Sequence, residues 1–112
     1  MPDSNIHVGD VGTELVCQLV DQDGDVVDLS AAGTMRIFLG KPGGSVLTKA
    51  AVLDTDGTDG RMKYLTIDGD VDEAGVWEIQ GRAAIGSYRY STSKGSFTVV
   101  RNTIDVEDDP DL

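Results

Sequence analysis

The sequence predicts an all-β fold, a sandwich or a small barrel, and three observations support this prediction. Short runs of residues alternate between apolar and polar side chains, a period of two that is typical of strands. Turn signals rich in Asp, Gly and Pro recur about every 8–12 residues between those runs. There is no sustained helical period, and the 14 glycines among 112 residues suit short strands joined by turns.

The first long strand is predicted at residues 13–20, where the side chains on one face are apolar, namely Leu15, Cys17 and Leu19. Residues 21–25, DQDGD, form an Asp–Gly turn that brings Val26 and Val27 back against this strand. Residues 28–32 are too few for a stable helix. We therefore expect a bend there that carries the chain to the other sheet.

The next two strands are predicted on either side of a Lys-Pro-Gly-Gly turn at residues 41–44. In residues 34–39, Met35, Ile37 and Leu39 share one face, whereas Arg36 and Phe38 take the other. Residues 45–53 form the returning strand. Both of its faces carry apolar side chains, so the pattern leaves the inward face open.

The stretch 54–84 is the predicted centre of the fold. Residues 62–67 and 75–84 alternate as strands, and the second carries Trp77, the only tryptophan and the largest apolar side chain available to the core. Gly81 within that strand indicates a bulge or a close approach by another backbone. We expect the residues before this stretch to supply one layer of a sandwich and those after it to complete the other.

Three parts are predicted along the chain: an N-terminal arm (residues 1–12), a sandwich (residues 13–100) and an acidic C-terminal tail (residues 101–112). The last strands lie at residues 88–92 and 96–100, with Phe97 and Val99 directed inward. The tail ends in EDDPDL, a polar, proline-containing composition that is typical of a flexible segment.

Length and charge narrow the classes of function. A chain of 112 residues predicts a single domain. The formal charge of −11 disfavours binding to nucleic acid and to anionic membranes, and no apolar run of about 18 residues predicts a membrane span. The N-terminus lacks the basic and apolar regions of a signal peptide. The single cysteine, Cys17, excludes an internal disulfide and is predicted as a small buried apolar residue.

Two Asp-rich loops are candidate calcium sites. The first holds Asp54, Asp56 and Asp59 and the second, at residues 68–72, has a similar composition. Their glycines fall at the wrong offsets for an EF-hand, so turn geometry is the alternative explanation for both loops. His7 is the only histidine and makes no zinc site without cysteines or clustered carboxylates. No nucleophile, base and orienting group occur together, so we expect neither an enzyme nor a cofactor.

Three segments taken together resemble a known family. They are LVDQDGDVVDLSAAGTMRIFLGKPGGSVLTKAAVLDTDGTDG, then RMKYLTIDGDVDEAGVWEIQGRA, then GSFTVV. Their order of strands and turns resembles the N-terminal domain of phage baseplate upper proteins and is similar to that of small immunoglobulin-like proteins of tailed phages. The resemblance covers about residues 13–100, and the chain lacks the long C-terminal part of a baseplate upper protein. It implies an immunoglobulin-like antiparallel β-sandwich that serves assembly.

The resemblance implies a non-enzymatic structural protein of a tailed-phage virion. We expect it to form homo-oligomers and to bind other virion proteins when the virion is assembled in the host cytoplasm. A component of the baseplate, tail or neck is the first expectation; a capsid decoration protein or a module that binds calcium or carbohydrate are the alternatives. Residues 45–53 form a strand that could pair with a neighbour or stay solvated. The residues expected to contact partners lie near the two ends: Ile6, His7, Val8, Ile104 and Val106.

Overall fold

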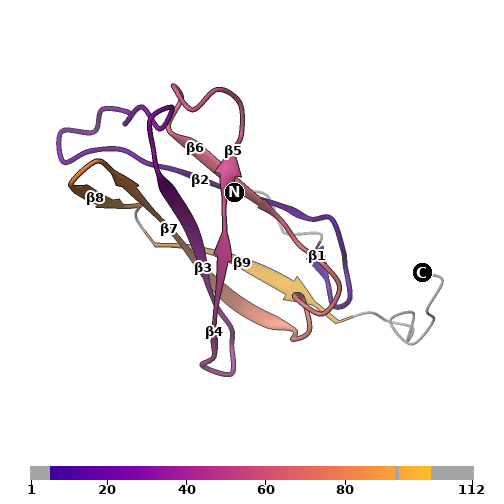
Figure 1. The fold of residues 1–112 in the computed structure, drawn as a ribbon. Coiled ribbons are helices and arrows are strands. Elements are labelled where there is room, and N and C mark those ends of the chain that lie inside the picture. The colour runs from indigo at the N-terminus through magenta and orange to yellow at the C-terminus, as the bar shows by residue number, and fades with distance from the viewer. Residues whose placement is uncertain (1–5, 93, 102–112) are drawn as a thin grey trace.

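The computed structural model describes residues 6–92 and 94–101, and these residues form two β-sheets packed as a sandwich (Figure 1). The six-stranded sheet has the order β1 (Ile6–His7), β9 (Gly95–Val100), β7 (Gly75–Ile85), β3 (Thr34–Gly40) and β4 (Val46–Ala50), with β8 (Tyr88–Ser91) paired to the far end of β7. The three-stranded sheet has the order β2 (Glu14–Gln18), β6 (Arg61–Leu65) and β5 (Val52–Leu53). Within the described residues there is no helix.

This strand order is that of an immunoglobulin-like domain, as the family resemblance implies. One sheet holds the second, fifth and sixth strands, and the other holds the remaining strands with the long β7 at its centre. The described strand pairs are antiparallel, with one exception that the sequence pattern does not predict: β1 runs parallel to β9.

The core lies between the sheets and is filled by the predicted inward side chains. The inward residues of β2 and the residues Ile37 and Leu39 of β3 are buried, Met35 is half-buried, and Phe97 and Val99 of β9 add to the same core. Trp77 is 1% exposed, stacks on Phe97 with 5.7 Å between ring centroids, and donates its indole N–H to the Glu73 carbonyl at 3.0 Å. The prediction that Trp77 is the centre of the core is therefore confirmed.

Cys17 and Gly81 face each other across the sandwich. A Cβ at position 81 would lie 3.1 Å from the Cys17 Cβ and 3.0 Å from the Met62 sulfur, so only glycine fits there without a shift. The predicted close approach is present, but the neighbours are side chains of β2 and β6 rather than another backbone. β2 and β7 take the places of the two strands that a disulfide joins in antibody domains; here, a single thiol packs against a glycine.

The predicted division into an early and a late layer is wrong. β3 and β4 precede residues 54–84 yet lie in the same sheet as β7 and β9. The chain changes sheets at the bend before β3, as predicted, and again at Ala51, which separates β4 from β5. The predicted single strand at residues 45–53 is thus two strands in different sheets, which explains why its alternation did not indicate one inward face.

Candidate docking surface

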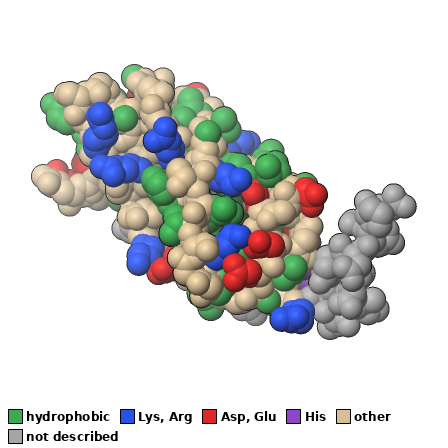
Figure 2. All heavy atoms as spheres, turned by 60° about the horizontal axis from the view of Figure 1, so that its bottom comes forward, with side chains coloured by type: hydrophobic (Ala, Val, Ile, Leu, Met, Phe, Trp, Pro, Cys, Tyr) green, Lys and Arg blue, Asp and Glu red, His purple; other side chains and the backbone are tan. Residues whose placement is uncertain are grey.

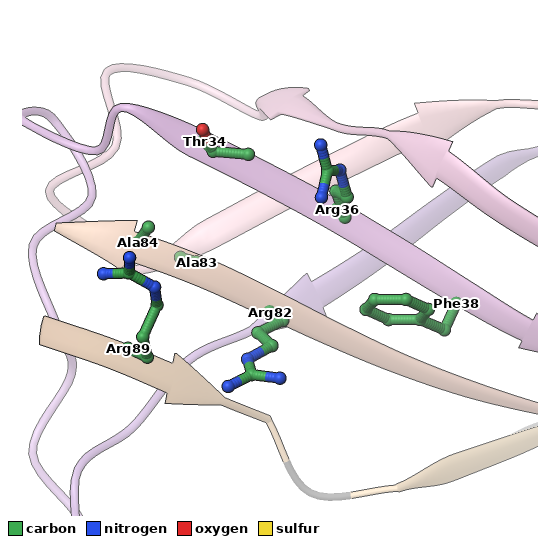
Figure 3. A pocket seen from close by; sticks show the side chains of 7 residues that line it. All are labelled: Thr34, Arg36, Phe38, Arg82, Ala83, Ala84 and Arg89. Atoms are coloured by element: carbon green, nitrogen blue, oxygen red, sulfur yellow. The ribbon is translucent and has the colours of Figure 1, made fainter.

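Arginine side chains from three neighbouring strands lie together on the outer face of the six-stranded sheet. Arg36 on β3 is directly opposite Arg82 on β7, and both are exposed. Arg89 on β8 is opposite Ala84, two positions along β7 from Arg82, which places it on the same face. Figure 3 shows the three side chains extending from β3, β7 and β8, with the ring of Phe38 further along β3. We call Arg36, Arg82 and Arg89 the arginine surface.

The positive charges of the arginine surface are not neutralised within the described part of the chain. Like charges on directly opposite residues of paired strands are destabilising. No carboxylate of residues 6–92 or 94–101 lies within 4.0 Å of the three guanidinium groups, and Arg89 donates only to the Tyr88 carbonyl, at 3.3 Å. Guanidinium groups bind carboxylates and phosphates through paired hydrogen bonds. The surface is therefore suited to an anionic partner.

A hollow of about 390 Å³ lies among these arginines, and its other lining residues are Thr34, Phe38, Ala83 and Ala84. A second hollow on the other side of Arg89 is lined by Asp21 and Asp23. The Asp21 carboxylate accepts hydrogen bonds from the N–H groups of Asp23 and Asp25 at 2.9 and 3.0 Å, so it stabilises its own turn. Figure 2 shows Lys and Arg side chains gathered at the end of the molecule where Figure 1 places β8.

The four lysines contrast with these arginines, because each forms an ion pair. The pairs are Lys41–Asp72 at 2.9 Å, Lys49–Asp70 at 2.9 Å, Lys63–Asp54 at 3.8 Å and Lys94–Glu78 at 3.2 Å. We call these contacts the lysine pairs. All of them join residues from different strands or loops, so these cations are used within the fold.

One lysine pair belongs to a partly buried network between the two sheets. Asp70 is 5% exposed, pairs with Lys49 of β4, and accepts hydrogen bonds from the Tyr64 hydroxyl of β6 and from the Ile67 N–H at 2.9 Å. Burial alone would raise the pKa of Asp70. The hydrogen bonds from Ile67 and Tyr64 and the contact with Lys49 outweigh burial and leave that pKa below its usual value. This arrangement stabilises the charged carboxylate and has a structural role.

The proposed calcium ligands are engaged in their own loop. Asp56 accepts from the N–H and hydroxyl of Thr58 at 3.0 and 2.7 Å, and Asp59 accepts from the Arg61 N–H at 3.1 Å. Asp54 pairs with Lys63. Across the residues that the structure describes, no three His, Cys, Asp or Glu side chains are placed to hold a metal ion. Turn geometry accounts for Asp56 and Asp59, and the ion pair with Lys63 on β6 engages Asp54.

The predicted contact residues at the start of the chain pack against the sandwich. Ile6 and His7 form β1, opposite Val99 and Val100 of β9. Ile6 and Val8 are half-buried and contact the core, and the His7 N–H donates to the Asp10 carboxylate at 2.9 Å. The other two predicted contact residues, Ile104 and Val106, lie outside the described residues. A role of these five residues in partner contacts stays a prediction.

The outer edges of both sheets present apolar side chains. β4 ends the six-stranded sheet, and Val46 on it is 62% exposed. β5 ends the three-stranded sheet, and its Val52 is 59% exposed. In the described part of the chain, no helix has the length and apolar character needed to span a membrane.

The arginine surface was not recognised from the sequence, although its signal was present. The alternation in β3 and β7 placed Arg36 and Arg82 on outward faces, but it did not indicate that β3 and β7 are neighbours.

Comparison with models of known protein families gave no match, and a search of curated proteins found no similar sequence.

Proposed function

We propose that this chain is a non-enzymatic structural protein of a tailed-phage virion, a component of the baseplate, tail or neck that acts by oligomerisation and docking. The order of strand and turn motifs resembles such proteins, and the immunoglobulin-like sandwich agrees with that resemblance. The observation that carries the proposal is the outer face of the six-stranded sheet, where like-charged arginines on neighbouring strands have no partner within the described domain. A protein that docks through this face gains the missing anions from its neighbour.

The edge strand β4 offers a second route for docking. Its pairing partner β3 lies on one side only, so the backbone groups on its other side are available to a strand of another subunit. The exposed Val46 adds apolar area to such a contact. Edge and face together suit a subunit that repeats in a symmetric assembly.

Particles purified from the phage that encodes the chain test this proposal. We expect the protein to copurify with the particles at a fixed copy number, and a cryo-EM map to contain density for the sandwich at symmetric positions. Density at the baseplate, tail or neck supports the proposal, whereas density on the capsid surface identifies a decoration protein instead. Absence from particles, despite production of the protein in infected cells, would rule out a virion role.

A further inference from the structure

The arginine surface carries a repulsion that the domain does not relieve by itself. Arg36 and Arg82 are directly opposite, and Arg89 adds a third positive charge on the adjacent strand. The fold neutralises all four lysines, whereas Arg61 and Arg101 also form no ion pair with a described carboxylate; the arginine surface differs from these two in that its three charges lie on adjacent strands. The three arginines are exposed and would gain hydrogen bonds and lose mutual repulsion on binding carboxylates.

The sequence supplies one segment of complementary charge. Residues 105–111, DVEDDPD, contain five acidic residues in seven, and residues 102–112 contain no lysine or arginine. The acidic groups of the first Asp-rich loop are already engaged with Lys63, Thr58 and the backbone of that loop. Residues 105–111 are therefore the acidic segment with the highest charge density in the sequence.

The position of β9 favours a segment from another copy over the chain's own. β9 pairs with the first half of β7 and runs antiparallel to it, so β9 ends beside Gly75, whereas Arg82 and the β8 pairing lie in the second half of β7 (Figure 1). Gly75 and Arg82 are seven positions apart, about 24 Å along the strand. To reach its own arginine surface, the chain after residue 101 would have to reverse and use about seven residues before the first contact. Most of the acidic residues of this segment would then be used to span that distance and would not reach the arginines.

We propose that the arginine surface of one copy binds residues 105–111 of a second copy, so that copies of the chain associate head to tail. The contact is carboxylate to guanidinium, without a covalent step. Such a contact joins two different patches and therefore generates rings or filaments rather than a closed pair. This inference rests on the proposed function, because it names the surface and the partner segment through which the protein would oligomerise.

Sedimentation analysis of the full chain at low and high salt tests this proposal. We expect the average mass to rise with protein concentration at low salt and to fall towards the monomer at about 0.5 M salt, where screening is strong. Arg82→Glu should weaken association at least about tenfold, because it inverts a charge at the centre of the surface. The matched control is Arg61→Glu, an exposed arginine on β6 of the other sheet, which should associate like the parent chain.

A mixing experiment identifies the second half of the contact. The variant Asp108→Lys/Asp109→Lys should also weaken association on its own. An equimolar mixture with Arg82→Glu should form a one-to-one complex and no larger species, because only one intact surface and one intact segment remain. Far-UV circular dichroism and Trp77 fluorescence of each variant should match those of the parent chain, which shows that the fold is retained.

Three outcomes would overturn the inference. A parent chain that stays monomeric at all concentrations would mean that the segment binds its own arginine surface or does not bind at all. Equal association of Arg82→Glu and Arg61→Glu would assign oligomerisation to another surface, such as β4. Loss of association in Arg82→Glu alone, with none in the lysine variant, would assign another anion to the arginines. In each case the proposed function stands or falls separately, on whether the protein is found in particles.

Discussion

The lysine pairs and the arginine surface use positive charge in two different ways. Each lysine pair joins residues from different strands or loops, and Lys49–Asp70 does so between the two sheets with the carboxylate buried. The arginines instead lie side by side on three adjacent strands with no carboxylate among the described residues to balance them. The lysine pairs are thus used within the fold, and we propose that the arginines recognise a partner.

The largest expected effect comes from removing the buried carboxylate of the lysine pairs. Asp70→Ala removes the buried carboxylate that pairs with Lys49 and accepts from the Tyr64 hydroxyl, so we expect the free energy of unfolding to fall by about 3 kcal/mol. The measurement is chemical denaturation followed by Trp77 fluorescence. Asp72→Ala is the matched control, because the Asp72 side chain is 49% exposed and its pair with Lys41 should contribute about 1 kcal/mol or less. Equal losses in the two variants would contradict the burial argument.

The next effect concerns the packing of the core beneath the arginine surface. Gly81 lies next to Arg82 but faces the core, and a methyl group there would press on Cys17 and Met62. We expect Gly81→Ala to lower the free energy of unfolding by about 2 kcal/mol through overpacking. Gly95→Ala serves as the control, since a Cβ there meets Ile79 at an ordinary 3.4 Å and the expected loss is about 0.5 kcal/mol or less. A neutral Gly81→Ala would mean that the core beneath the arginine surface is loosely packed.

A smaller effect is the pH dependence of stability, which we expect from the Lys49–Asp70 pair and not from the arginine surface. The pKa of Asp70 is lower in the folded state than in the unfolded chain, so its contribution to stability is present above the unfolded value near 4 and is lost as the pH falls through the folded pKa. Arginines stay charged over this range. We expect the stability gap between the parent chain and Asp70→Asn to narrow as the pH falls from 6 to 2, as measured by denaturation midpoints. An unchanged gap would contradict the lowered pKa.

The smallest effect is the change in stability when one positive charge is removed, and we expect opposite signs at the arginine surface and at the lysine pairs. Arg82→Thr removes a like charge opposite Arg36 and should raise the free energy of unfolding of the dilute monomer by about 0.5 kcal/mol at low salt. Lys41→Thr removes the pair with Asp72 and should lower it by a similar amount. Arg61→Thr controls for the higher strand preference of threonine. Both shifts should shrink in 1 M salt, and a destabilising Arg82→Thr would mean that this arginine has a partner in the monomer.

The sequence was sufficient to predict the strands and the faces that they bury. The alternation of Leu15, Cys17 and Leu19, and the single indole of Trp77, identify core positions that the structure confirms. An alternation with a period of two shows which side of a strand is apolar, but it does not show which strand lies next to it. The sheet change at Ala51 and the contact of Arg36 with the β7 strand were therefore beyond the pattern.

The prediction of contact residues met the same limit. An apolar alternation at Ile6 and Val8 is equally consistent with packing on a partner and packing on the chain's own sandwich. In the structure both residues contact the core beside β9. The outward arginines could have been found by examining the polar face of each predicted strand, because Arg36, Arg82 and Arg89 all fall within predicted strands.

The parallel pairing of β1 with β9 determines how the domain carries mechanical load. Ile6 and His7 lie beside Val99 and Val100, and the Val8 N–H donates to the Val100 carbonyl at 3.0 Å. Because the strands run in the same direction, tension applied to the two ends of the chain slides one strand along the other. All of the hydrogen bonds between them then resist at once, whereas an antiparallel pair would unzip bond by bond. A subunit pulled by its ends would thus yield abruptly, when these few hydrogen bonds break together, with β1 as the first strand to detach.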